Sequence, residues 1–142
     1  MREILFKAKR IDNGEWVEGC YAECNGKTFI GIDISIGIDD IFEVFCTYVI
    51  RWLEVDPETL CQFTGETDKN GKRIWESDVV WLVYDGKEHI YQIVWDNSEL
   101  DFKATNGEEN YGSNFEYLLC CDEIEVIGNI FDNPELLQEK HK

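Results

Sequence analysis

Polar and hydrophobic residues alternate along most of this chain with a period of two, which is typical of β-strands rather than helices. The clearest run is IDISIGID at residues 32–39. Four isoleucines share one face of this predicted strand, namely Ile32, Ile34, Ile36 and Ile38. Residues 41–55 are rich in β-branched and aromatic types, which favours one long strand or two strands with a bend.

Turn-forming dipeptides separate the predicted strands. Asn25-Gly26 is a two-residue hairpin signal, and Asn70-Gly71 and Asp85-Gly86 predict type I′ hairpin turns because apolar runs flank both. We expect strands near 73–75, 79–84, 89–95, 100–105, 114–121 and 124–131. Residues 58–64 form a connector whose state the pattern leaves open.

The last residues predict a helix and not a strand, because Asn133 can cap a short helix that begins at Pro134. The predicted fold class is therefore mostly β, with barrel-like or curled antiparallel sheets built from hairpins and a short C-terminal α-helix. We expect an N-terminal β lobe at 1–57, a barrel-like β lobe at 58–132 and a helix or tail at 133–142. A single domain that includes all three parts is the alternative.

The charge balance restricts the partners. The 142 residues hold 13 Lys+Arg and 30 Asp+Glu, a formal net charge of −17. Such a chain repels phosphate, so direct binding to nucleic acid or to anionic membrane surfaces is disfavoured. An aromatic content of 13% indicates a folded core despite the charge. The N-terminal MREILFKAKR has no apolar signal core and no run is long enough to span a membrane, so we expect a cytoplasmic protein.

The chain contains no motif that is specific for a catalytic or metal site. The pairs Cys20/Cys24 and Cys120/Cys121 could supply four thiolates to zinc. Cys20 and Cys24 have a C-x3-C spacing, but no second C-x2-4-C pair exists, and free thiols are the default. The DKNGK segment fails as a calcium loop because Lys72 and Val79 stand where oxygen ligands are needed. Glu76 and Asp78 lie on the same face of a predicted strand and could hold a cation or act as an acid/base pair, although residues of this kind more often complete a turn. We therefore predict no catalytic residue, no metal and no cofactor.

Four segments together resemble the YopX family of phage and prophage proteins. They are FKAKRIDNGEWVEG at 6–19, ETLCQFTGETDKNGKRIWESDVV at 58–80, YQIVWDNSELDF at 91–102 and IEVIGNIFDNPELL at 124–137. Ser77 departs from the usual pattern, because it replaces the glycine of the family's E-G-D turn. The resemblance implies a mostly-β fold, a phage or prophage setting and a homo-oligomer. It implies no catalytic residues.

The functional expectation is a non-enzymatic protein of interaction or self-assembly, with a host or phage protein as a further partner. Exposed strand edges are templates for pairing with another chain. We expect the interaction surface at the isoleucine ribbon and the DKNGK turn, which includes Lys69, Asn70 and Gly71. The alternatives are an acidic inhibitor that mimics DNA toward a nucleic-acid enzyme, and a small metal-dependent enzyme.

Overall fold

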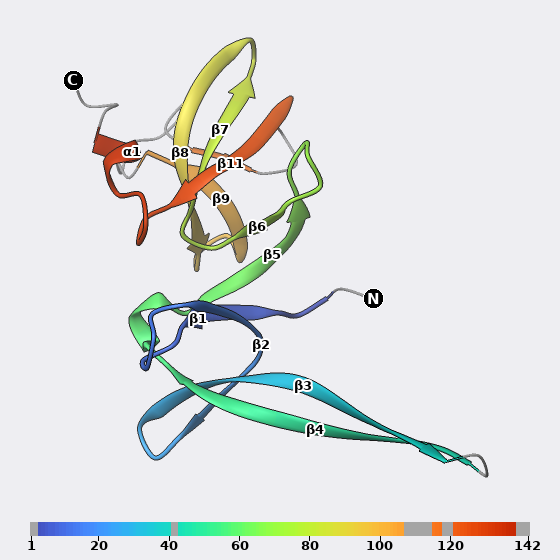
Figure 1. Ribbon diagram of the computed structural model, residues 1–142. Coiled ribbons are helices and arrows are strands. Elements are labelled where there is room, and N and C mark those ends of the chain that lie inside the picture. The colour runs from blue at the N-terminus through green and yellow to red at the C-terminus, as the bar shows by residue number, and fades with distance from the viewer. Residues whose placement is uncertain (1–2, 41–42, 107–114, 118–120, 139–142) are drawn as a thin grey trace. The chain divides into compact units, whose positions relative to one another are not determined.

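The computed structural model describes residues 3–40, 43–106, 115–117 and 121–138, with side chains described for all of these except 33–40, 43–49, 115–117 and 138. The described chain is mostly antiparallel β-sheet, with one short α-helix near its C-terminal end (Figure 1). The sheets are not closed into a barrel. This confirms the predicted fold class, in the form of open, curled sheets. The chain divides into two compact units, residues 3–62 and 63–142.

The first unit is an antiparallel sheet in which hydrogen bonds link the strands in the order β4-β3-β2-β1-β5. Its elements are β1 (Phe6–Lys9), β2 (Trp16–Cys24), β3 (Lys27–Asp40), β4 (Glu43–Val55), a 3-10 helix η1 (Pro57–Thr59) and the start of β5 (Cys61–Thr67). A small core of Ala8, Ile30 and Val55 is fully buried, with Phe6, Val17, Tyr21 and Leu60 packed against it. These core residues come from four neighbouring strands and the residue before β5, and the two on β1 and the two on β2 are an even number of positions apart, as the period of two predicts.

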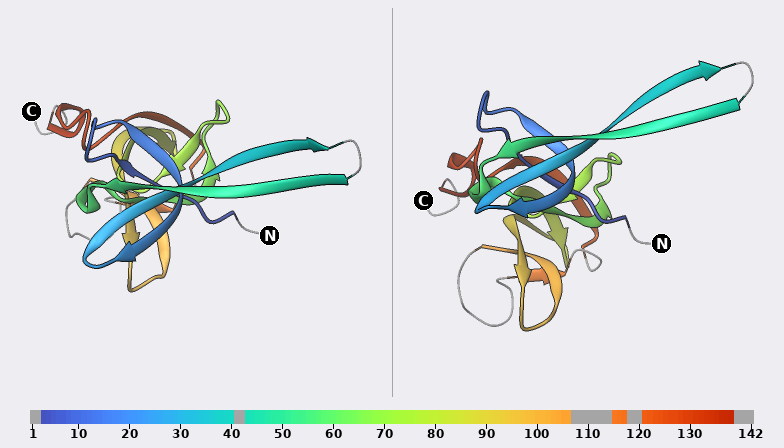
Figure 2. Two further views of the ribbon diagram at one scale, coloured as in Figure 1. Left: turned by 60° about the horizontal axis from the view of Figure 1, so that its bottom comes forward. Right: turned by 90° about the horizontal axis from the view of Figure 1, so that it is seen from below.

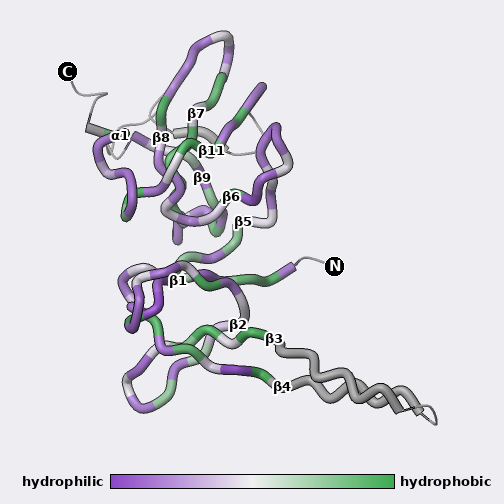
Figure 3. Tube along the Cα trace, viewed as in Figure 1, coloured by the Kyte–Doolittle hydropathy of each residue, from purple (hydrophilic) through white to green (hydrophobic). Residues whose placement is uncertain are grey.

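The second unit contains a five-stranded antiparallel sheet in the order β10-β9-β8-β7-β11. Its elements are β6 (Arg73–Trp75), β7 (Asp78–Tyr84), β8 (Lys87–Asp96), β9 (Asp101–Thr105), β10 (Phe115–Tyr117), β11 (Glu123–Asn129) and α1 (Glu135–Gln138). The remainder of β5 pairs with β6. The buried core consists of Ile74, Val80, Leu82, Tyr91, Ile93, Phe102 and Ala104. Hydrophobic residues dominate β7, whereas the loop between β5 and β6 is hydrophilic (Figure 3).

Turn chemistry is confirmed at two of the three predicted hairpins. Asn25 and Gly26 have φ of 53° and 75°, and Asp85 and Gly86 have φ of 50° and 75°. Two positive values in succession define a type I′ turn. The expectation for Asn70-Gly71 was wrong, because only Gly71 has a positive φ and the strands pair at Thr67 and Arg73. The five residues between them form a wider loop.

Two further expectations need correction. Residues 61–67 form strand β5 instead of an undefined connector. The C-terminal helix begins at Glu135, and the Asn133 side chain accepts a hydrogen bond from the backbone N–H of Asn129 rather than capping the helix. Within the described residues, no helix is long and apolar enough to cross a membrane.

Candidate interaction surfaces

Strands β3 and β4 extend beyond the rest of their sheet as a two-stranded ribbon (Figures 1 and 2). They pair without a register shift from Thr28 opposite Val55 to Asp40 opposite Glu43. Strand β2, in contrast, pairs with β3 only from Lys27 to Gly31. We call residues 32–40 and 43–51 the arm. In the described chain the arm has no third strand beside it, and an isolated two-stranded hairpin is only marginally stable in water.

The base of the arm is tightly packed around two glycines. A Cβ atom at Gly31 would lie 2.8 Å from the side chains of both Ile50 and Trp52, and a Cβ atom at Gly19 would lie 2.0 Å from the carbonyl oxygen of Gly31. Such distances exclude any side chain at either position without a shift of neighbouring atoms. The absence of side chains lets β2, β3 and β4 approach closely where the arm leaves the sheet.

Large apolar side chains are exposed at the same place. Ile50 is 45% exposed and Trp52 is 46% exposed. Large aromatic and aliphatic residues of this kind are typical anchors of protein interfaces. Of the predicted isoleucine ribbon, Ile32 is half-buried. The side chains of three further predicted residues lie outside the described set, namely Ile34, Ile36 and Ile38, and their backbones are paired opposite Val49, Thr47 and Phe45.

The outer edge of β4 is covered only near its C-terminal end, among the described residues. Arg10 forms an isolated antiparallel bridge with Val55. The backbone N–H of Ile11 donates to the carbonyl of Glu54 at 3.1 Å, and the N–H of Asp56 donates to the carbonyl of Lys9 at 2.8 Å. These bonds cover the outer edge of β4 at residues 54–56. From Trp52 back to Glu43, no described segment pairs with that outer edge.

The predicted residues Lys69, Asn70 and Gly71 are exposed and belong to the loop between β5 and β6. Asp68, which is 6% exposed, holds this loop in place. Its Oδ1 accepts the backbone N–H groups of Asn70 and Lys72, both at 2.9 Å, and its Oδ2 accepts the N–H of Val126 on β11 at 3.0 Å. The backbone N–H of Lys69 donates to the carbonyl of Ile124 at 3.0 Å.

The loop therefore covers the outer edge of β11, which protects that edge from pairing with another chain. Side chains add to the contact. The Lys69 ammonium lies 3.6 Å from a Glu125 carboxylate oxygen and 4.9 Å from the centre of the Trp81 ring. Burial acts to raise the pKa of Asp68, but the N–H groups of Val126, Lys72 and Asn70, with the charge of Lys72, lower it below its usual value.

The E-S-D turn between β6 and β7 is held by a second buried carboxylate. Asp78 is 2% exposed, and its Oδ2 accepts the backbone N–H of Trp75 at 2.8 Å. Ser77 has a φ of 73°, and its backbone is fixed by hydrogen bonds with Ile93 and Ile130. Asp78 thus stabilises the turn through its side chain. This is the commoner role of an acidic residue beside a turn, in comparison with acid or base catalysis.

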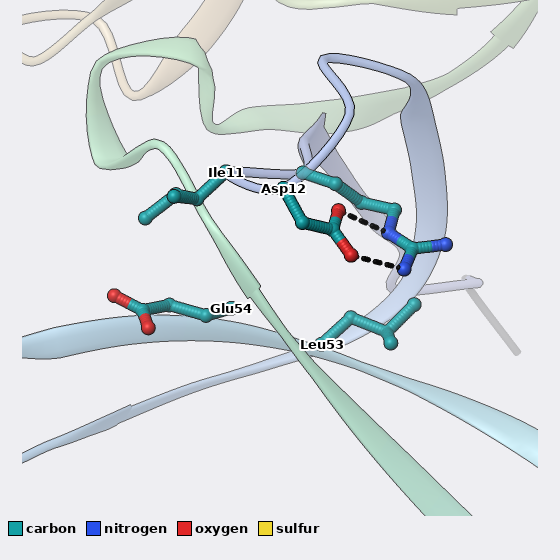
Figure 4. Close-up of a pocket in the computed structure, with 5 residues that line it drawn as sticks. Ile11, Asp12, Leu53 and Glu54 are labelled. Carbon is teal, nitrogen blue, oxygen red and sulfur yellow. Dashed lines mark hydrogen bonds and ion pairs between the residues drawn. The ribbon is translucent and has the colours of Figure 1, made fainter.

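A shallow pocket of about 140 Å³ lies between the β1–β2 turn and β4, lined by Arg10, Ile11, Asp12, Leu53 and Glu54 (Figure 4). The Arg10 guanidinium donates to both carboxylate oxygens of Asp12, at 2.9 and 2.6 Å. This hydrogen-bonded pairing lowers the pKa of Asp12. Sites for small molecules typically measure ~300–1,000 Å³, so this pocket is too small to enclose one.

The thiols show no common site in the described chain. Cys20 and Cys24 are exposed, Cys61 is buried, and Cys121 is half-buried. Cys120, the other member of the vicinal pair, lies outside the described residues. Among the residues that are described, no three His, Cys, Asp or Glu side chains lie close enough together to hold a metal ion.

Comparison with known proteins identifies the family. The model of the YopX protein family matches residues 5–138, nearly the whole chain. The chain belongs to this family. It is also similar in structure to protein EF1440 from Enterococcus faecalis, known from a crystal structure, with a TM-score of 0.57 and 21% identity over 96% of this chain and 99% of that one. No curated protein matches.

Family membership confirms the resemblance seen in the sequence, and the structure gives its central segment a physical meaning. Gly65 and Gly71 have φ of 91° and 81°, values at which glycine is favoured. Asp68 fixes the loop to β11 and Asp78 fixes the following turn. The segment that resembles the YopX signature therefore supplies the β5–β6 loop and the β6–β7 turn of the second unit. Nothing local in the sequence signals this role of Asp68, because its partner Val126 lies 58 residues away.

Proposed function

We propose that this YopX-family protein is a non-enzymatic interaction or self-assembly protein of phage or prophage origin, which acts in the cytoplasm of its host. The arm is its contact surface. The observation that carries the proposal is the length of β3 and β4 that no described third strand covers. The exposure of Ile50 and Trp52 at its base supports the same assignment.

One further observation favours binding over catalysis. The buried carboxylates Asp68 and Asp78 accept backbone hydrogen bonds, so their chemistry is used in the fold. Two-stranded ribbons that extend from a sheet gain stability when another chain covers them.

An armless variant tests the proposal. Replacing residues 33–50 with Asn-Gly joins Ile32 to Arg51, which already lie opposite each other, through a two-residue hairpin turn. A second variant changes the predicted ribbon to serine at four positions, Ile32, Ile34, Ile36 and Ile38. Each variant is compared with the natural chain by light scattering and by affinity capture from host cells in which the phage or prophage is active. Circular dichroism verifies that the sheets persist.

We expect both variants to lose the assemblies and the captured proteins that the natural chain shows. The proposal fails if the armless variant assembles and captures proteins as the natural chain does. An acidic inhibitor would give a different result, because its partners would be basic, would be released steeply by salt and would not depend on the arm.

A further inference from the structure

We propose that two copies of this chain pair edge to edge through β4, antiparallel, about a two-fold axis at Thr47. The result is a four-stranded sheet built from two arms. This inference rests on the proposed function, because it names the partner of the arm as a second copy. Three observations support it: the register between β3 and β4, the backbone hydrogen bonds at the base of the arm, and the charges along its two edges.

The two edges of the arm differ in charge. On the β3 side, residues 32–40 include three acids, Asp33, Asp39 and Asp40, and no base. Like charges repel across a strand pair, so this edge resists pairing with its own copy. On the β4 side, residues 44–50 (VFCTYVI) contain no charged residue and no proline. An uncharged strand of β-branched and aromatic residues is the edge that favours pairing.

The hydrogen bonds at the base show which residues of β4 present their backbone groups outward. The carbonyl of Glu54 accepts from Ile11 on the outer side. The register with β3 runs without a shift to Glu43, so every second residue shares that direction. Trp52, Ile50, Tyr48, Cys46 and Val44 therefore carry the outward N–H and C=O groups.

This alternation limits the registers open to a symmetric pair. Outward residues must lie opposite outward residues, so a two-fold axis must pass through a residue and not between two residues. An axis at Thr47 satisfies this condition. It places Val44 opposite Ile50 of the second copy and Cys46 opposite Tyr48 of the second copy.

Charge selects Thr47 among the permitted axes. With the axis there, Glu43 of each copy lies opposite Arg51 of the other, and all residues between are uncharged. Moving the axis by one residue in either direction places both charges opposite uncharged residues. The Thr47 register therefore forms two acid–base pairs per dimer, one at each end, and the residues between them meet only uncharged residues.

The paired length is modest. Residues 43–51 rise by roughly 30 Å at about 3.4 Å per residue. One edge-to-edge ladder of this length belongs with small, weak interfaces, so we expect a concentration-dependent dimer and not a permanent one. Sedimentation equilibrium of the full chain from about 1 to about 500 μM covers the affinities of such interfaces.

Matched proline variants test which edge is used. Tyr48 lies opposite Ser35 in the arm, and both present their N–H groups away from the neighbouring strand. Proline at either position removes one outward donor, a change that edge strands tolerate. We expect Tyr48→Pro to abolish the dimer and Ser35→Pro to leave it. Cys46→Pro, on the same edge as Tyr48 but without loss of an aromatic ring, should also abolish it.

Charge variants test the register. Glu43→Arg or Arg51→Glu alone creates two like-charge pairs per dimer, and we expect each to weaken dimerisation by on the order of 10- to 30-fold at low salt. The double variant restores opposite charges in the same register and should recover the natural affinity to within about threefold.

The outcomes separate this inference from the proposed function. A natural chain that stays monomeric at every concentration overturns the inference, as does a dimer that survives Tyr48→Pro or is lost in Ser35→Pro. A double charge variant as weak as the single variants overturns the register. If the inference fails while the armless variant still loses captured proteins, the arm binds a different protein and the proposed function stands.

Discussion

Removal of the Asp68 carboxylate should destabilise the second unit by a defined amount. This carboxylate accepts three backbone N–H groups, two from its own loop and one from β11. A hydrogen bond to a charged acceptor contributes about 1.5–3 kcal/mol, and bonds that share one acceptor group are not additive. Asp68→Asn keeps one accepting oxygen and turns an amide N–H₂ toward a neighbouring donor. We expect it to lower the free energy of unfolding by about 2 kcal/mol.

The effect should depend on pH with a definite sign. The native hydrogen bonds hold the pKa of Asp68 below its usual value, so the folded state favours the charged form. The stabilisation is complete above the unfolded-state pKa of about 4 and is lost as the pH falls through the folded-state pKa. The difference between the natural chain and Asp68→Asn should therefore be full at neutral pH and shrink progressively below about pH 4.

Urea unfolding followed by tryptophan fluorescence measures the change, and peptide-resolved hydrogen exchange assigns it to the second unit. Asp122→Asn removes the same charge from an exposed residue and serves as the control. Equal unfolding midpoints for Asp68→Asn and the natural chain would refute the reasoning. So would a difference that stays constant on acidification, because the carboxylate charge would then have no part in it.

Two further changes test backbone conformation and close packing. Ser77→Gly should raise the free energy of unfolding by about 0.5–1 kcal/mol, because Ser77 has a φ of 73° that glycine adopts without strain; thermal unfolding checks this, and a lower melting temperature would contradict it. Gly31→Ala should cost about 1–3 kcal/mol, since the added methyl meets the movable side chains of Ile50 and Trp52. Gly19→Ala should cost more, because its methyl meets the rigid backbone oxygen of Gly31 at 2.0 Å. Urea titration ranks the two variants, and the reverse order would show that the base of the arm adapts differently.

Neighbouring residue types were sufficient to predict the structure wherever they alone decide the backbone conformation. Asn25-Gly26 and Asp85-Gly86 form the predicted type I′ turns because these residue types accept positive φ. The alternation at 32–39 predicted a strand, and β3 includes those residues. The mostly-β fold class and the YopX family followed from the same local patterns and motifs, and both are confirmed.

Local rules failed where a distant partner decides the structure. Asn70-Gly71 has the composition of a two-residue hairpin, yet Asp68 draws the loop onto Val126, 58 residues away, and a wider loop results. Residues 58–64 show no clear alternation of polar and hydrophobic residues, so the sequence left their structure open. Strand β5 forms there through its pairing with β1 and β6, and this pairing is irregular between Phe63 and Thr67.

The sequence by itself determined most of the strands, the two positive-φ turns at Asn25-Gly26 and Asp85-Gly86, and the family, since these depend on neighbouring residues. Only the tertiary structure decided which edges are covered. The loop that holds Lys69 closes the edge of β11, and residues 10–11 close the end of β4 but not its outer part. Edge protection depends on which segments meet in space, and the alternation of residues along one strand does not contain that information.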